Sequence, residues 1–585
     1  MVTNGRGLAG RVGYGLLFVA VLPALLWSWA IRLDAVVRWP VPDWHTPGLV
    51  LAGAGSLLAL AGMRALIVRG RGLPMNAYPP LIFVANGVYA LLAHPIYAGA
   101  FLAAVGASLW MGSASGLVLV APALGLMMVS LVYGYERPAL RRRFGARAIA
   151  HRPWLALPPS DGAATRGPRR LATAAAIAAP WLFAGYAIDF ARHGPAITAP
   201  YLSLWQPTEW SAPWRFSWLV PGTFLLARVL LARTNRQLRH ASIAAIAWAA
   251  AMLYLDVVAP PLGDDLARSA PWLALVAAAA AALAAGWRAV WDVTRAVAEA
   301  VANSRCDWLL LGGRLRVINH AAFSFALGAV SAAMACAVLR DPAPVLLGIA
   351  CVLAGAALYA QLSWGSGALL RPFGFWGSVP GLAVALVLAR VLFGTPLLQV
   401  TLAAVLAAPF GQAVGRLRCL AQGCCHGVPS DARFGIRVWQ AQSRVVVLSK
   451  LAGAWILPTQ LYSILFNLAL GPLLVSMWLA HVFPATLIVG AYFFLTGIER
   501  FAEDAYRGET QTRTIAGLKE PQWIALGSVV GGMALTVVPS PVLLPQPLPA
   551  GSTWVATAIT GGLLTAFAMS VDFPRSHARF SRLSG

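Results

Sequence analysis

The chain consists largely of apolar runs about 20 residues long, and this pattern limits its fold more than any other feature. A helix needs about 20 predominantly apolar residues to cross the roughly 30 Å hydrocarbon core of a membrane. Hydrophobic residues make up 59% of the chain and charged residues only 11%, which excludes a set of soluble domains. The sequence therefore predicts an all-α polytopic membrane protein with about 16 transmembrane helices in two fused helical domains.

The expected spans follow from the same criterion of length and hydropathy. They lie at about 12–31, 48–66, 94–112, 115–134, 171–188, 214–232, 241–258, 270–290, 320–339, 343–363, 378–394, 397–414, 461–480, 484–498, 522–539 and 553–571. A further segment, 287–302, has helical periodicity with charged residues and is predicted to lie on the membrane surface.

The net charge of +24 is carried almost wholly by arginine, since Lys450 and Lys519 are the only lysines. These arginines sit in short loops, where the positive-inside rule and anionic lipid headgroups account for them. Nucleic acid is therefore not an expected partner. Arg6 and Arg11 near the start and Arg575, Arg579 and Arg582 near the end predict that both termini are cytoplasmic, and the even number of spans agrees.

The densest group of reactive side chains lies in 415–427, directly after the apolar run 397–414. This stretch holds three of the six cysteines together with two arginines, a histidine and several glycines. It opens a polar region that extends to Pro458. Polar chemistry is thus expected at a membrane boundary.

A second group lies in the first third of the chain, in 87–99 and 136–145. His94 and Pro95 interrupt the chain at the edge of a span, and Glu136 comes just after the next apolar run. We expect His94 and Glu136 to face one another across a helical hairpin. The alternative is structural: His94 caps a helix beside a proline turn, and Glu136 pairs with Arg137 or Arg141.

The order of these residues resembles the isoprenylcysteine carboxyl methyltransferase and phospholipid methyltransferase family, with its Arg-His-Pro-x-Tyr-x-Gly and Glu-Glu motifs, over about 50–155. The resemblance implies a membrane-embedded pocket for S-adenosylmethionine. In that pocket His94 and Tyr97 would line the cofactor and Glu136 would bind it. The sequence departs from the family at Ala93, where an arginine is expected, and at Arg137, where a second glutamate is expected.

Four motifs in the second half occur in a fixed order: 375–381, 415–427, 457–462 and 497–508. Together they resemble prolipoprotein diacylglyceryl transferase, in particular cysteine-containing relatives, over about 340–540. The resemblance implies an essential arginine at Arg416 and a second arginine motif at Arg500, Phe501, Asp504 and Arg507. It also implies substrate contacts from Gln460 and Tyr462. Trp376 stands where the family often has histidine, and Cys419 replaces the signature asparagine.

The chemistry of phosphate binding supports a functional role for these arginines independently of the resemblance. Guanidinium offers a planar fork of donors that binds phosphate in a bidentate way. An arginine within a membrane normally faces a cavity and has a partner. We therefore expect Arg416, Arg418, Arg500 and Arg507 to converge on the phosphate of a phospholipid. Ordinary positive-inside placement is the alternative for Arg418 and Arg507.

The sequence leaves more than one role possible for the two histidines and for the cysteines of the second half. His426 and His320 are candidates for a catalytic base, and an interfacial histidine without catalytic function is the alternative for each. Cys419 is a candidate nucleophile, activated by the nearby arginines. Cys419, Cys424, Cys425 and His426 resemble a ligand set, but their spacing matches none of the usual paired zinc patterns, so no metal is expected. Small packing cysteines remain the third interpretation.

These observations predict a lipid-modifying transferase of the bacterial inner membrane. It would move a glyceryl or phosphoglyceryl group from a phospholipid resembling phosphatidylglycerol to an unidentified lipid, glycan or protein acceptor. The predicted regions are 1–168, methyltransferase-like with a basic linker; 169–312, an Ala-rich connecting region; and 313–585, diacylglyceryl-transferase-like. The alternatives are a non-catalytic lipid-binding or transport protein, and a protein in which only methyl transfer is active.

Overall fold

The structure is a computed structural model in which most of the chain is helical. It describes residues 13, 15–36, 45–72, 80–145, scattered positions in 153–178, and then 213–258, 291–364, 370–371, 377–479, 483–508, 514–544, 551–578 and 581–583. Within these residues, eight helices are long and apolar enough to cross a membrane. A helical multi-pass membrane protein is thereby confirmed. The count of about 16 spans stays a prediction, because the expected span 270–290 and much of 171–188 lie outside the described residues.

The chain divides into two compact units. The first comprises residues 1–129 and 139–292, and the second comprises 130–138 and 293–585. This grouping assigns a short piece of the first third of the chain to the second unit. The three regions expected from the sequence remain a prediction about organisation.

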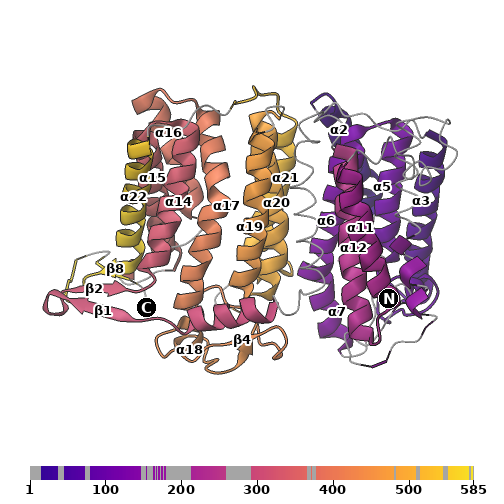
Figure 1. Cartoon of the computed structure of the whole chain (residues 1–585), viewed down its shortest axis with the longest axis horizontal. Helices are drawn as coiled ribbons and strands as arrows, with labels where there is room; N and C mark the ends of the chain where they lie inside the picture. Colours follow the sequence, from indigo (N-terminus) through magenta and orange to yellow (C-terminus); the bar gives the residue numbers. More distant parts are fainter. Residues whose placement is uncertain are drawn as a thin grey trace, which may run out of the picture. The chain divides into compact units, whose positions relative to one another are not determined.

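The helices of the first unit begin and end close to the expected positions (Figure 1). Its elements are η1 (Leu17–Val21), α2 (Leu22–Asp34), α3 (His45–Val68), α4 (Val88–Leu91), α5 (Pro95–Met111), η2 (Gly116–Val120), most of α6 (Ala121–Leu131) and of α7 (Arg137–Phe144), α11 (Pro213–Leu230) and α12 (Asn235–Val258). Between α6 and α7 lies η3 (Val132–Glu136), which belongs to the second unit.

Small residues set the spacing between α3 and α5. Gly55 of α3 and Gly99 of α5 face one another so closely that a Cβ on either would overlap the backbone of the other helix. Gly48 and Gly106 repeat this arrangement about two turns away. Close approach of this kind is how membrane helices associate without a hydrophobic driving force.

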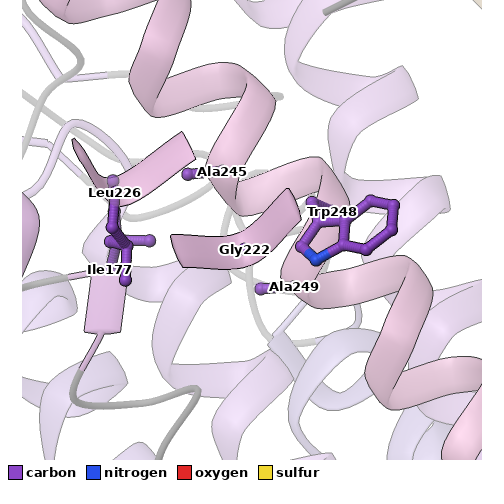
Figure 2. Close-up of a pocket in the computed structure, with 6 residues that line it drawn as sticks. All are labelled: Ile177, Gly222, Leu226, Ala245, Trp248 and Ala249. Atoms are coloured by element: carbon purple, nitrogen blue, oxygen red, sulfur yellow. The ribbon is translucent and has the colours of Figure 1, made fainter. Parts of the chain in front are cut away.

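Helices α11 and α12 pack through a second apolar cluster that includes Leu225, Val229, Leu238 and Trp248, all nearly or fully buried. A small cavity lies in this cluster (Figure 2). Its lining residues are Ile177, Gly222, Leu226, Ala245, Trp248 and Ala249. Apart from the indole of Trp248 the lining is aliphatic, so the cavity offers packing space and no reactive group.

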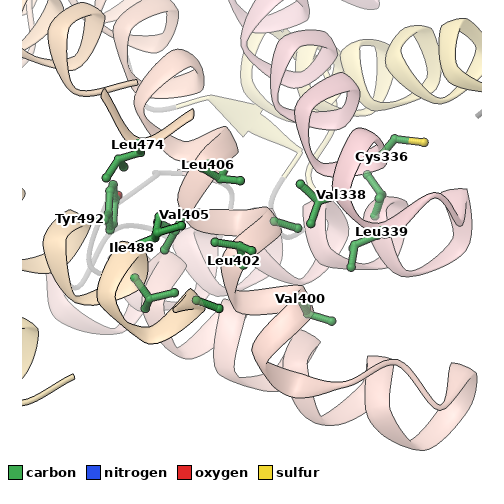
Figure 3. Packing of buried hydrophobic residues seen from close by; sticks show 14 of the residues in the cluster. Cys336, Val338, Leu339, Val400, Leu402, Val405, Leu406, Leu474, Ile488 and Tyr492 are labelled. Carbon is green, nitrogen blue, oxygen red and sulfur yellow. The ribbon is translucent and has the colours of Figure 1, made fainter. Parts of the chain in front are cut away.

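The second unit contains α14 (Ala321–Leu339), α15 (Pro342–Trp364), α16 (Ser378–Phe393), α17 (Leu397–Gln422), α18 (Arg444–Val447), α19 (Thr459–Leu479), α20 (Ala485–Tyr506), α21 (Glu520–Thr536) and α22 (Gly551–Ser570). Its core forms where α14, α17, α19 and α20 meet, around Leu402, Leu406, Leu474 and Ile488 (Figure 3). The same unit contains 130–138, where the Ser130 hydroxyl donates to the Ile498 carbonyl at 2.7 Å and the Gln522 amide donates to the Gly134 carbonyl at 3.2 Å.

Short strands join these helices. Strands β1 (Asp307–Leu310), β2 (Leu315–Ile318) and β8 (Val571–Asp572) form one antiparallel sheet. The pairs β3 (Leu370–Arg371) with β9 (Arg582–Leu583), β4 (Ile436–Arg437) with β5 (Trp455–Ile456), and β6 (Thr514–Ile515) with β7 (Leu518–Lys519) are two-stranded. The prediction of an all-α chain holds for the spans, and the strands lie in the connections.

The expected surface segment 287–302 is helical over its described part, 291–302. Arg295 of this helix donates to the carbonyls of Ala432 and Gly435 at 2.8 and 3.0 Å, and the Glu299 carboxylate accepts from the Arg437 amide at 2.8 Å. The helix therefore fastens the loop that follows α17.

A buried polar network connects the start of α14 with the end of α22. The Arg316 guanidinium pairs with both carboxylate oxygens of Asp572, at 2.9 and 2.6 Å, and the Asp572 hydrogen bond raises the pKa of Arg316. The His320 Nδ1 lies 2.8 Å from the Ser570 hydroxyl, which lies 2.7 Å from the Ser324 hydroxyl. Burial lowers the pKa of His320 to about 2, and the charges of Arg418, Arg305 and Arg316 lower it further.

The packing of α20 on α21 leads to a test with a built-in control. A Cβ at Gly532 would meet the backbone of Phe494 and would lie 2.7 Å from the Gly490 carbonyl, whereas one at Gly531 would meet nothing within 4 Å. Gly532→Ala should lower the free energy of unfolding by about 1–3 kcal/mol because the helices must separate. Gly531→Ala should leave stability unchanged or raise it by up to about 1 kcal/mol. Equal unfolding free energies for the two variants in detergent would contradict this packing.

His320 makes stability depend on pH. Its pKa of about 2 in the folded protein lies below the ordinary 6.5, so the unfolded chain binds a proton that the folded chain excludes. Stability should therefore be complete above about pH 6.5 and fall by about 1.4 kcal/mol for each pH unit below it. Unfolding of the wild type and of His320→Gln, measured from pH 7.5 to 4.5, should differ in slope. Parallel pH profiles would show that the imidazole has the same pKa in the folded and unfolded states, which would contradict its exclusion of a proton.

Candidate active site

The reactive stretch begins on a helix. The apolar run ends at Val414, but α17 continues to Gln422, so Arg416, Arg418 and Cys419 lie on its last turns. The span expected to end at residue 414 is therefore eight residues shorter than the helix. The helix continues because its polar side chains find partners on neighbouring helices.

Glu503 is the centre of the site. One carboxylate oxygen, Oε2, accepts from Arg416 Nη2 at 3.2 Å and from Arg500 Nη1 at 2.8 Å. The other, Oε1, accepts from Arg507 Nη2 at 3.1 Å. Arg507 also contacts Asp504 through Nε, at 3.0 Å. Three of the four arginines predicted to converge thus meet at one carboxylate.

The spacing along α20 explains how the cluster forms. Arg500 lies three residues before Glu503 on α20, and Arg507, four residues after Glu503, directly follows the helix, so both guanidinium groups reach the carboxylate. Arg416 completes the cluster from α17, and its Nε donates to the Ser463 hydroxyl of α19 at 3.1 Å. The apolar run predicts that this span ends at residue 498, whereas α20 continues to Tyr506.

The cluster is deeply buried. The Glu503 side chain is 2% exposed and the three guanidinium side chains are 9–13% exposed. Removing one partner of a buried ion pair typically costs about 3–5 kcal/mol because a charge is left uncompensated. The arginines are therefore held in fixed orientations at the end of the helix bundle.

Arg418 lies elsewhere. Its Nη2 donates to the Met569 carbonyl of α22 at 2.9 Å, so it takes no part in the contacts to Glu503. His320, one of the two predicted bases, lies at the start of α14, and its Nδ1 is hydrogen-bonded to the hydroxyl of Ser570 at the end of α22. Trp376 lies outside the described residues.

The three cysteines of the stretch come together just beyond α17. Gly423 ends the helix in the left-handed conformation, with φ of 76°, and Cys425 is also left-handed, with φ of 57°. The chain therefore turns back, and the sulfurs of Cys419, Cys424 and Cys425 lie within 4.8 Å of one another. Hydrogen bonding to the other two sulfurs, together with burial, raises the pKa of Cys424.

The start of α19 fixes this turn. Gln460 Nε2 donates to the Cys424 carbonyl at 2.6 Å, and the Thr459 hydroxyl donates to the Cys425 carbonyl at 2.5 Å. Gln460 thus orients the cysteine turn through its backbone. Tyr462 lies on the next turn of the same helix.

His426 connects the turn to the end of α20. Its carbonyl accepts from the Gly508 amide at 2.8 Å, and Gly427 pairs with Arg507 in an isolated bridge. His426 is 3% exposed. The backbone of this candidate base is thereby placed beside the arginine motif. Figure 1 shows α18, β4 and the β1–β2 hairpin at the same end of the second unit as the ends of these helices.

The methyltransferase-like motif is also formed locally. His94 is the residue before α5, which begins at Pro95, and the His94 and Tyr97 rings stack with centroids 5.8 Å apart. Glu136 ends η3, and Arg137 places its guanidinium 4.9 Å from the centre of the Tyr133 ring. Since His94 and Glu136 belong to different compact units, their pairing stays a prediction.

Sequence reasoning missed Glu503, the residue that holds the arginines together. It lies within the motif 497–508, in which Asp504 is the acidic residue that matches the family pattern. The available signal was its position three residues after Arg500 and four before Arg507, on a helix otherwise apolar enough to span a membrane.

Comparison with known proteins agrees with both resemblances. Residues 352–538 match the prolipoprotein diacylglyceryl transferase family, and residues 44–147 match the phospholipid methyltransferase family. A curated relative, a phosphatidylglycerol–prolipoprotein diacylglyceryl transferase of Clostridium perfringens, is 26% identical over 203 residues. That match covers 33% of this chain and 76% of the relative. The chain is therefore a membrane lipid transferase that carries a methyltransferase-like domain.

Proposed function

We propose that the chain moves a glyceryl or phosphoglyceryl group from an anionic phospholipid, of which phosphatidylglycerol is the leading candidate, to an acceptor in the bacterial inner membrane. The observation that carries this proposal is the convergence of Arg416, Arg500 and Arg507 on Glu503. The matched relative uses phosphatidylglycerol and prolipoprotein, according to its name. Both termini are proposed to be cytoplasmic.

The arginines suit the donor lipid because its phosphate is a fixed anion close to the membrane boundary. Glu503 holds three guanidinium groups together before any lipid arrives, so little reorganisation is needed when phosphate binds. Two of them, Arg416 and Arg500, come from different helices and approach the same carboxylate oxygen. A phosphate that lies beside this carboxylate would meet guanidinium groups from two helices.

For transfer of a glyceryl group, the bond between a glyceryl carbon and a phosphate oxygen breaks, and the electron pair leaves with the phosphate. A nucleophilic atom of the acceptor bonds to the same carbon and loses its proton to a base. The arginines stabilise the negative charge on the departing phosphate. We propose His426 as the base, because the pKa of about 2 makes His320 a very weak one.

Cys419 occupies the place of the signature asparagine and lies beside Arg416. We propose that this exchange alters the acceptor side of the site, whereas the donor side is kept by the arginines. The acceptor class, whether lipid, glycan or protein, follows from the product formed.

Arg416→Lys tests the donor site. Lysine keeps the charge but loses the planar fork, so consumption of labelled phosphatidylglycerol in proteoliposomes should fall about 100-fold or more. Arg390→Ala is the matched control, since Arg390 is an exposed arginine at the end of α16 that donates to the Gly394 carbonyl. The control should keep the wild-type rate. Equal rates for Arg416→Lys and wild type would overturn the donor role.

The non-catalytic alternative makes a different prediction in the same assay. A lipid-binding or transport protein would retain phosphatidylglycerol in detergent without consuming it. Lipid profiles of deletion and wild-type cells would then also be identical. Retention of phosphatidylglycerol without turnover, or identical lipid profiles in the two strains, would contradict the transferase proposal.

A second function is supported by the first unit. We propose that His94 and Tyr97 bind S-adenosylmethionine. The rings of His94 and Tyr97 stack at the start of α5 and offer a flat aromatic surface, which suits the planar adenine of the cofactor. Bound cofactor would supply an electrophilic methyl group. The role of the protein residues is to hold and orient it.

Cofactor binding by the full chain tests this second function. His94→Ala should weaken binding of labelled S-adenosylmethionine about tenfold, the equivalent of about 1.4 kcal/mol. Ala93→Arg, which restores the family residue, should strengthen it. His577→Ala, a change at an exposed histidine in the second unit, should have no effect. No measurable binding by either the wild type or Ala93→Arg would leave only the glyceryl transfer proposal.

A further inference from the structure

The three-thiol cluster, Cys419, Cys424 and Cys425, is more than the proposed transfer requires. All three residues are thiols, and their sulfurs lie within 4.8 Å of one another. With metal–sulfur bonds of about 2.3 Å, three sulfurs around one ion would lie about 4 Å apart. The cluster therefore needs only small adjustments to surround a metal ion.

The backbone that carries the sulfurs is fixed before any ligand binds. Gly423 donates its amide to the Cys419 carbonyl at 2.9 Å and turns the chain back over the end of α17. Gln460 and Thr459 then hold the carbonyls of Cys424 and Cys425. Cys425 keeps a left-handed φ of 57°, which costs energy for a residue with a side chain and persists only where its surroundings impose it.

Two arginines balance the charge of this cluster. Arg416 interacts electrostatically with Cys419 and Cys425, and Arg418 interacts with Cys419 and Cys424. A single Cu⁺ bound to three thiolates carries two negative charges, and Arg418 together with Arg416, which also pairs with Glu503, stabilises this charge.

The number of sulfur ligands also favours a monovalent copper ion. Among the residues that the structure describes, no histidine, aspartate or glutamate joins the group of three sulfurs. Structural zinc sites almost always have four protein ligands, and zinc held by three protein ligands takes a water molecule as the fourth, whereas three soft thiolates complete the coordination of Cu⁺. Pure thiolate coordination in a trigonal arrangement therefore favours the monovalent ion.

We propose that Cys419, Cys424 and Cys425 form a three-sulfur binding site for a monovalent copper ion at the end of α17. This property goes beyond the proposed transfer reaction, and its test does not depend on lipid turnover. It departs from the expectation, drawn from sequence spacing, that the stretch binds no metal.

The test uses the purified full chain in detergent without oxygen. Cu⁺ is supplied as a coloured chelator complex, and the protein should withdraw one equivalent of copper from it. Cys419→Ser, Cys424→Ser and Cys425→Ser should each weaken binding at least 100-fold. Cys351→Ser, in α15, should bind as the wild type does, and Cys306→Ser shows whether the exposed thiol contributes. Equal binding by the wild type and the three site variants would overturn the proposal.

A second measurement keeps the proposal testable even if a serine variant does not fold. X-ray absorption of the copper-loaded wild type should show three sulfur neighbours at about 2.3 Å. Two sulfur neighbours, or nitrogen bound directly to the copper, would contradict the three-sulfur site. Zn²⁺ displacing Cu⁺ at equal concentration would contradict the choice of a monovalent ion.

Discussion

A carboxylate buried at the end of a helix bundle is stable only where cations surround it, and Glu503 meets this condition through three arginines. Arg500 comes from the same helix, Arg507 directly follows that helix and Arg416 comes from α17, so the ion cluster fixes how these helices end relative to one another. The backbone links from His426 and Gly427 to α20 follow from this contact. Those links position the cysteine turn and the candidate base.

Much of the helical framework could be predicted from the sequence, because apolar runs of sufficient length define spans directly. The helices α14, α15, α16, α21 and α22 begin and end within about three residues of the expected spans. The ends of α17 and α20 could not be predicted in this way. There the helix continues into polar sequence, since Arg416 and Glu503 satisfy one another across helices that hydropathy treats separately.

The site was predictable only in part, for a similar reason. Motif order identified Arg416 and Arg500, but not the carboxylate that unites them. Linear spacing likewise gave no paired zinc pattern for the cysteines, because a left-handed turn at Gly423 folds a five-residue separation back onto one point. Arg418 shows the converse error: a neighbour in sequence that faces another helix and donates to Met569.

The placement of residues 130–138 within the second unit has a consequence for how the protein is made. Ser130 is synthesised 368 residues before its partner, the Ile498 carbonyl. The second unit therefore cannot close on this segment until residue 498 has been synthesised. A gene split that separated the first third of the chain from the second unit would therefore also remove the hydrogen bonds of Ser130 to Ile498 and of Gly134 to Gln522.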